Sequence, residues 1–113
     1  MKKQILLLLA VVLVSSAFQM FKTTLTVTVR DDLGNTVEEA TIQLFETEDD
    51  YLKEENVAAE GVTDKKGVFK FKELKPVPYF VIVRKDDKDN AGGGEKIEKL
   101  EEKKVNKVTI IIQ

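Results

Sequence analysis

Between residues 25 and 72, apolar and polar positions alternate in short runs that are separated by turns. Leu25 to Arg30 carries an apolar side chain at every second position, and Ala40 to Phe45 repeats this after a turn at Asp31 to Asn35. Val68 to Lys72 alternates again after a second turn at Asp64 to Gly67, so Phe69 and Phe71 share a face. A period of two residues between Asp- and Gly-containing turns predicts half-buried strands of an antiparallel sheet.

Further strands follow toward the C-terminus. Tyr79 to Val83 is apolar on both faces and predicts a central strand, while both prolines fall in the break at Lys75 to Pro78. Val105 to Ile112 predicts the C-terminal strand, and shorter strands are expected around Val57 to Val62 and at Ile97 to Leu100. About seven short strands separated by turns predict an all-β fold, a seven-stranded antiparallel Greek-key β-sandwich of the immunoglobulin-like or prealbumin-like kind.

Two polar segments interrupt this pattern. The acidic segment Glu46 to Glu60 predicts a loop with one turn of helix, capped by Thr47 or Asp49. Arg84 to Glu95 is rich in Asp and Gly and predicts a polar loop.

The first seventeen residues have the features of a signal peptide. Met1 to Lys3 is basic, Ile5 to Val14 is uniformly apolar, and Ser15 to Ala17 provides small residues for cleavage after Ala17. The apolar run is shorter than the roughly 20 residues that span a bilayer. We therefore expect an exported protein whose mature domain is residues 18–113 and has no stable membrane span. A signal segment that is retained is the alternative, and the sequence leaves open the periplasm, the cell surface and secretion.

The composition of the chain excludes several classes of function. The 113 residues suggest one domain, and the 18 basic and 20 acidic residues give a net charge of −2, which is unlike the basic balance of a nucleic-acid-binding protein. The chain has no Cys and no His, which excludes disulfides, thiolate chemistry and a His base. An exported domain without disulfides fits a bacterial envelope. We predict a protein that is not an enzyme and that has no catalytic, cofactor-binding or metal-binding residues.

The strand and turn residues together resemble the carboxypeptidase regulatory-like and Cna B-type domains. The resemblance covers residues 25–83 and rests on these positions: Val27, Val29, Asp31, Gly34, Val37, Ala40, Ile42, Leu44, Thr63, Asp64, Gly67, Phe69, Phe71, Leu74, Tyr79, Val81 and Val83. It implies a transthyretin-like (prealbumin-like) sandwich, which usually serves as an accessory or surface module of exported bacterial proteins. These residues form turns and core, so they speak to the fold more than to function.

The resemblance also implies one covalent site to consider, because some Cna B-type domains form an isopeptide bond between Lys and Asn or Asp. The lysine is expected near the end of the first strand, where this chain has Val29 and Arg30. An arginine cannot replace it, because its guanidinium stays protonated. Lys22 and Asn106 are an off-pattern pair. We expect instead a solvated Lys22 and an Asn106 at an edge or turn.

The loop Asp86 to Glu95 offers oxygen atoms of the kind that Ca²⁺ prefers. Asp87 and Asp89 match the first two ligand positions of an EF-hand loop, but Ala91 occupies the third. A solvated hairpin is the favoured interpretation, and calcium binding stays open.

Two acidic pairs are candidates for glycosidase chemistry. Glu54-Glu55 and Glu101-Glu102 are adjacent in sequence, so on a strand their carboxylates point to opposite faces. We interpret them as solvated surface.

Aromatic and apolar residues offer candidate contacts for a partner. Tyr51, Tyr79 and Phe80 are the candidates for a sugar platform, although Tyr79 is expected in the core or at a corner. The run Ile110 to Ile112 must turn one member outward, where it marks a sheet edge for a partner unless the Glu46 to Glu60 segment covers it.

The sequence therefore predicts a non-enzymatic exported module with a structural role or a protein or glycan partner. A small-molecule or carbohydrate-binding periplasmic protein is the alternative. Under either function, the residues that determine binding specificity are expected in the two segments that depart from the strand pattern, Glu46 to Glu60 and Asp86 to Glu95.

Overall fold

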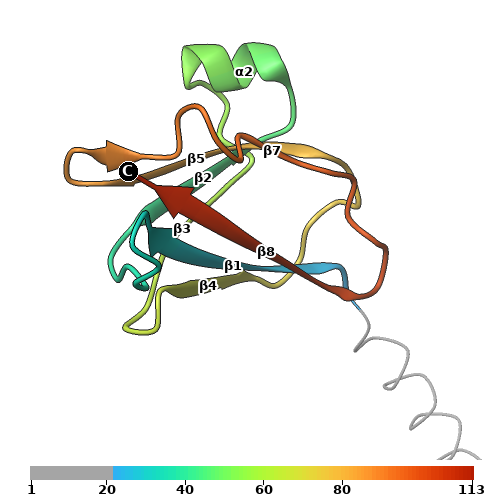
Figure 1. Ribbon diagram of the computed structural model, residues 1–113. Helices are drawn as coiled ribbons and strands as arrows, with labels where there is room; N and C mark the ends of the chain where they lie inside the picture. Colours follow the sequence, from blue (N-terminus) through green and yellow to red (C-terminus); the bar gives the residue numbers. More distant parts are fainter. Residues whose placement is uncertain (1–21) are drawn as a thin grey trace, which may run out of the picture.

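Two β-sheets pack face to face in the computed structural model, which describes residues 22–113 (Figure 1). The predicted signal peptide, residues 1–17, lies outside the described residues. One sheet has the strand order β4-β1-β8, and the other has the order β3-β2-β5-β6, with β7 also paired to β5. The elements are β1 (Thr24–Asp31), β2 (Thr41–Phe45), α2 (Glu48–Lys53), β3 (Ala59–Val62), β4 (Val68–Phe71), β5 (Tyr79–Lys85), β6 (Lys88–Asp89), β7 (Lys96–Ile97) and β8 (Val105–Ile112).

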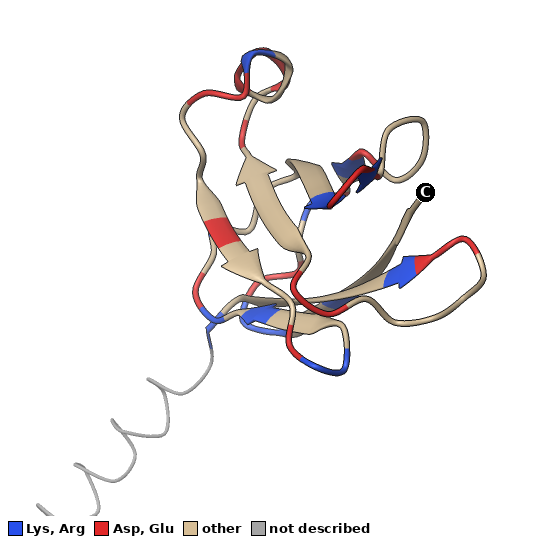
Figure 2. Cartoon of the chain, turned by 90° about the vertical axis from the view of Figure 1, so that its left-hand side faces the viewer, with Lys and Arg blue, Asp and Glu red and all other residues tan. Residues whose placement is uncertain are grey.

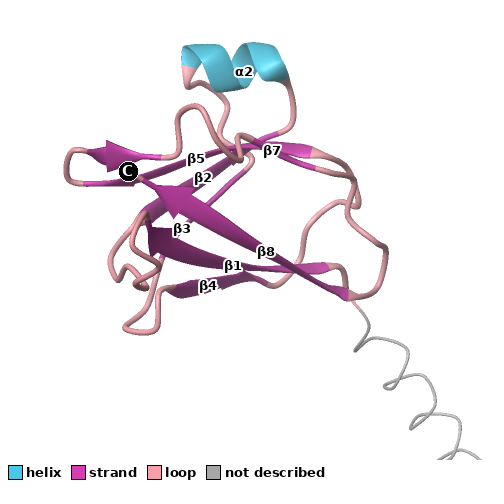
Figure 3. Ribbon diagram, viewed as in Figure 1, coloured by secondary structure: helices cyan, strands magenta, loops and turns pink. Residues whose placement is uncertain are grey.

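The structure confirms the principal strands and corrects three details of the prediction. Eight strands appear within the described residues instead of seven, two of them only two residues long, because the predicted polar loop Arg84 to Glu95 contains the end of β5 and all of β6. The short strand expected at Ile97 to Leu100 is Lys96–Ile97. β5 is central, as predicted, with β2 on one side and β6 and β7 on the other (Figure 3). The Greek-key connectivity stays a prediction.

The direction of β8 also differs from the prediction, so the sandwich is not wholly antiparallel. β8 pairs with β1 in parallel, from Thr24 opposite Val105 to Asp31 opposite Ile112. The segment after β7 returns to the end of the sandwich where β1 begins, since the amide N–H of Thr24 donates to the carbonyl of Lys104 at 3.0 Å. β8 therefore starts beside the start of β1 and runs in the same direction.

The core lies between the two sheets. It is formed by the inward side chains of the predicted period-two pattern, which are almost completely buried: Leu25, Val27, Val29, Ile42, Leu44, Tyr79, Val81, Val83, Ile110 and Ile112. Full burial of one such aliphatic side chain contributes roughly 1.5–3 kcal/mol. The two polar segments, Glu46 to Glu60 and Arg84 to Glu95, contribute none of these side chains, and both are attached to the sandwich.

The helix α2 covers the outer face of the five-stranded sheet. Phe45 points outward from β2 but is fully buried, because Tyr51 of α2 packs on it with ring centroids 6.1 Å apart. Tyr51 also stacks on Phe80 of β5 at 5.6 Å. Thr47 is the N-cap, and its Oγ1 accepts a hydrogen bond from the amide N–H of Asp50 at 3.1 Å. The predicted helical turn is confirmed, and of the two candidate caps it is Thr47, while Asp49 lies within the helix.

Candidate functional site

The loop between β6 and β7 is fixed to β5 by one buried side chain. The Oδ1 of Asn90 accepts from the amide N–H of Val83 at 2.9 Å, and its Nδ2 donates to the carbonyl of Val81 at 3.0 Å. The same Nδ2 donates to the carbonyl of Gly94 at 3.3 Å. The Asn90 amide thus takes the place of a strand residue beside β5. No pattern in the sequence pointed to this role, because an asparagine close to a run of glycines is typical of any turn.

The end of α2 is tied to β5 by an ion pair. Glu54, the C-cap, has a left-handed backbone with φ 54°. Its two carboxylate oxygens accept from the guanidinium of Arg84 at 2.5 and 3.0 Å, in a bidentate arrangement. This hydrogen bonding by Arg84 lowers the pKa of the Glu54 carboxyl. The acidic segment is thereby joined to the sheet on which it lies.

A cleft of about 180 Å³, which we call the α2 cleft, lies between α2 and the loop Asp86 to Glu95, which we call the glycine loop. Its apolar lining is Tyr51, Leu52, Ile82 and Ala91, and its polar lining is Glu54, Arg84, Asp89 and Asn90. These residues come from the two segments in which specificity was expected and from β5 between them. The structure therefore brings together two segments that are separate in sequence.

The electrostatic environment of the α2 cleft is acidic. Burial raises the pKa of the Tyr51 hydroxyl, and the nearby charges of Glu95 and Asp89 raise it further. Arg84 acts in the opposite direction, but Glu54 pairs with it. Tyr51 therefore presents a protonated hydroxyl in negative surroundings.

The Glu54–Arg84 pair makes part of the stability depend on pH. The pKa of Glu54 lies below its ordinary value of 4.5 in the folded state, so the folded chain favours the ionised form. Its contribution is present above the unfolded pKa and is lost as the pH falls through the folded pKa. We expect Glu54→Gln to lower the melting temperature slightly at about pH 7, and we expect this difference from the wild type to shrink as the pH is lowered toward about 2. Circular dichroism melts across this range test the prediction, and a difference that does not change with pH contradicts it.

The three aromatic candidates for a sugar platform separate into two environments. Tyr79 is only 2% exposed, and its hydroxyl donates to the carbonyl of Lys75 at 3.0 Å. This confirms its expected place in the core. Tyr51 and Phe80 stack on each other, and the ammonium of Lys96 lies 5.8 Å from the centroid of the Phe80 ring. Of the three, only Tyr51 lines the α2 cleft.

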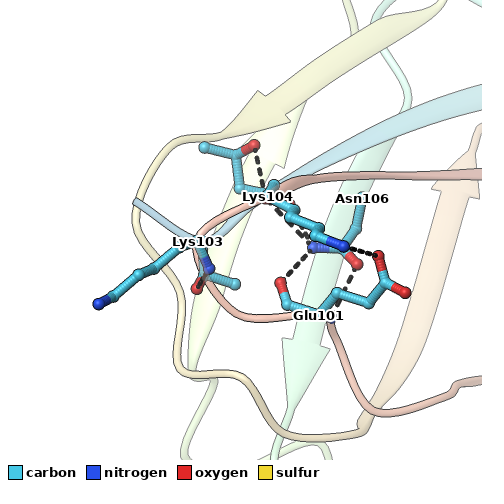
Figure 4. A network of polar contacts seen from close by, with 6 residues as sticks. Glu101, Lys103, Lys104 and Asn106 are labelled. Atoms are coloured by element: carbon cyan, nitrogen blue, oxygen red, sulfur yellow. Dashed lines mark hydrogen bonds and ion pairs between the residues drawn. The ribbon is translucent and has the colours of Figure 1, made fainter. Parts of the chain in front are cut away.

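Lys22 and Asn106, the candidate pair for an isopeptide bond, have different partners in the structure. The ammonium of Lys22 lies 3.4 Å from a carboxylate oxygen of Glu73, and its side chain is exposed, as expected. Figure 4 shows Asn106 within a different network, in which its Nδ2 donates to the carbonyls of Thr24, Glu101 and Lys104 at 3.0, 3.1 and 3.3 Å. The Oδ1 of Asn106 accepts from the amide N–H of Glu101 at 2.9 Å. Asn106 thus fastens the loop before β8 to β1.

Two of the carboxylates of the Asp86 to Glu95 loop accept hydrogen bonds from its own backbone. The Oδ1 of Asp89 accepts from the amide of Ala91 at 2.9 Å, and the Oε1 of Glu95 accepts from the amide of Gly92 at 2.6 Å. β5 and β6 form the hairpin of the favoured interpretation. Within residues 22–113, no three His, Cys, Asp or Glu side chains are grouped to hold a metal ion. A solvated hairpin stays the favoured interpretation, and a calcium titration of the melting temperature tests it.

In each of the two acidic pairs, one glutamate forms an ion pair and the other does not share its partner. Glu54 binds Arg84, and Glu101 lies 3.7 Å from the ammonium of Lys104. Glu55 and Glu102 are exposed. The carboxylates of each pair therefore have different surroundings, as the interpretation of solvated surface expects.

The outward member of the C-terminal isoleucine run is Ile111, which is 45% exposed. Its strand, β8, is an edge of the three-stranded sheet, whereas α2 packs on β2 and β5 of the other sheet. The prediction of an exposed isoleucine is confirmed, and the alternative that the Glu46 to Glu60 segment covers it is wrong.

Comparison with known proteins identifies the fold. No family model and no curated protein matches the sequence. A crystal structure of the group B streptococcus pilus 2b backbone protein matches with a TM-score of 0.59 and 14% identity, over 80% of this chain and 40% of that chain. This chain thus spans about two fifths of that pilus protein. Within residues 22–113, no helix is long and apolar enough to cross a membrane.

At 14% identity, the likeness concerns the fold alone. It supports the predicted β-sandwich, and membership of the carboxypeptidase regulatory-like or Cna B-type domains stays a prediction. The chain is a β-sandwich similar in fold to part of a streptococcal pilus backbone protein.

Proposed function

We propose that this chain is an exported, non-enzymatic module of the bacterial envelope that binds a protein partner through the α2 cleft. One observation carries the proposal. The segments Glu46 to Glu60 and Asp86 to Glu95, which depart from the strand pattern, meet at one cleft on a rigid sandwich. Loops held by a scaffold are the usual place for binding residues.

The size of the α2 cleft favours a side chain of a larger partner. Pockets for small-molecule ligands commonly measure about 300–1,000 Å³, whereas this cleft measures about 180 Å³. Leu52, which lines the cleft, is 69% exposed and therefore also offers apolar surface to a larger partner. Such a surface suits one anchoring side chain with further contacts around it.

The charges favour a basic anchor. The negative charges of Asp89 and Glu95 act on the Tyr51 hydroxyl and raise its pKa, and Arg84 is paired with Glu54. A lysine or arginine places its aliphatic stem on apolar surface and its charge among carboxylates. We therefore propose a partner that presents a Lys or Arg side chain.

The non-enzymatic part of the proposal rests on the side chains present. The chain has no His or Cys to act as base or nucleophile, and its acidic pairs are divided between different partners. Export rests on the signal-like residues 1–17.

A carbohydrate is the second candidate ligand. Tyr51 lies beside the polar groups of Asp89, Asn90 and Arg84 in the α2 cleft, a combination that suits one sugar ring. A ring of this kind would stack on Tyr51 and hydrogen-bond to its neighbours.

Filling the α2 cleft tests the proposal. Ala91 is an exposed residue of its lining, so Ala91→Phe occupies the cleft, while Glu98→Phe adds the same ring at an exposed position that does not line it. We expect wild type and Glu98→Phe to retain the same proteins from an envelope extract and Ala91→Phe to lose them. Equal retention by all three proteins contradicts the proposal. Binding to a defined sugar on a glycan array, abolished by Ala91→Phe, replaces the protein partner with the second candidate.

A further inference from the structure

An acidic segment lies over the five-stranded sheet, and basic residues lie on the outer face of the other sheet. The segment Glu46 to Glu60, which we call the acidic arm, contains seven acidic residues and one lysine. Figure 2 shows the red of this arm concentrated at α2, above the five-stranded sheet. Because the sheets pack face to face, the outer face of the three-stranded sheet points away from the arm.

The outer face of the three-stranded sheet is basic. The strand register places Lys70 of β4 and Lys107 of β8 on either side of Thr26 in one row. Arg30 lies on the same face of β1, two rows further along. Alternation of side chains puts no acidic residue on this face of β4, β1 or β8, and the remaining positions are threonines and valines together with Ile111. We call this surface the basic face.

Each surface also carries exposed apolar side chains. On the basic face, Val105 is 53% exposed, and Ile111 is likewise uncovered. On the acidic arm, Leu52 and Val57 are exposed. Charge of opposite sign around exposed apolar groups is typical of two surfaces that bind each other.

We infer that the chain associates with itself, the acidic arm of one copy docking on the basic face of the next. The occupant of the basic face is a second copy because this protein carries the complementary surface, and its net charge of −2 disfavours a nucleic acid. The two surfaces differ and lie on opposite sides, so the contact is heterologous and leaves an unused arm and face at the two ends of each dimer. Such a contact extends into open chains.

This inference goes beyond the proposed function, because it adds the basic face on the other side of the sandwich. It uses the exposed charges of the acidic arm and not the filling of the α2 cleft. Ala91→Phe is therefore expected to leave self-association unchanged even where it abolishes partner binding. The two proposals fail separately.

Charge reversal tests the inference on the protein as purified from cells. Variant F carries Lys70→Glu and Lys107→Glu on the basic face, and variant A carries Glu48→Lys and Glu55→Lys at exposed positions of the acidic arm. Sedimentation velocity at about 20 mM salt is expected to show a wild-type mass that rises with concentration and falls to the monomer at about 500 mM salt. Each variant alone is expected to associate at least about tenfold more weakly.

A mixture of the two variants gives the decisive measurement. In the mixture, the lysines of variant A meet the glutamates of variant F, and the unchanged arm of F meets the unchanged face of A. We expect the mixture to regain the wild-type association, which misfolding of either variant cannot produce. A wild type that stays monomeric at low salt overturns the inference. Association that survives in either variant alone also overturns it, since another surface must then be responsible.

Discussion

Replacing Asn90 by alanine is expected to lower the free energy of unfolding by about 2–4 kcal/mol, because each buried backbone group left without a partner costs about 1–3 kcal/mol. The change leaves the amide N–H of Val83 and the carbonyl of Val81 without partners on the central strand β5. It also removes the side-chain contact between Asn90 and Gly94 in the glycine loop, which forms one wall of the α2 cleft. We therefore expect partner binding to weaken together with stability.

Urea unfolding of a small series measures the effect of Asn90. Asn90→Asp keeps an acceptor for the amide N–H of Val83 but loses the donor to Val81, so its stability is expected between wild type and Asn90→Ala. Asp87→Ala, at an exposed position of the same hairpin, is the control and is expected within about 0.5 kcal/mol of wild type. If Asn90→Ala is as stable as this control, Asn90 does not hold the loop.

Replacing Gly61 by alanine is expected to cost about 1–3 kcal/mol, since overpacking forces neighbouring side chains from their preferred positions. A Cβ on Gly61 of β3 would overlap the aromatic ring of Phe69 on β4. Phe69 packs against the core and makes an edge-to-face contact with Phe71, with ring centroids 4.7 Å apart. The ring therefore has little freedom to move aside.

A double-mutant cycle separates this steric effect from the general effect of alanine. Gly93→Ala is the matched control, because a Cβ there meets nothing within 4 Å and neither glycine has a left-handed φ. Phe69→Leu removes the ring, so Gly61→Ala is expected to cost at least about 1 kcal/mol less in that background. Equal costs of Gly61→Ala with and without the ring would refute the proposed overlap.

The strands were predictable because their residues repeat a local rule. Val27, Val29, Ile42 and Leu44 alternate with polar residues, and one buried face per strand imposes this period. The cap at Thr47 was predictable for the same reason, since it depends on a contact only three residues away. The direction in which β8 pairs was not, because a period of two is the same in parallel and antiparallel strands.

The candidate site depends on contacts between distant residues. The two segments that form the α2 cleft were identified in the sequence by their departure from the strand pattern, but their meeting depends on the packing of Tyr51 against Phe80 and on the Glu54–Arg84 pair. Asn90 reads in the sequence as a turn former, and only the gap between β6 and β7 gives it a structural role. The separation of charge was hidden as well, because a net charge of −2 says nothing about how the signs are distributed.

The central claim is that the α2 cleft is the surface that a protein partner occupies, and photo-crosslinking in the producing cell tests it most directly. A photoreactive phenylalanine derivative replaces Ala91, which lines the cleft, or Glu98, which does not. The account predicts a covalent adduct with a discrete protein from position 91 and none from position 98. No adduct from either position, or the same adduct from both, would contradict it.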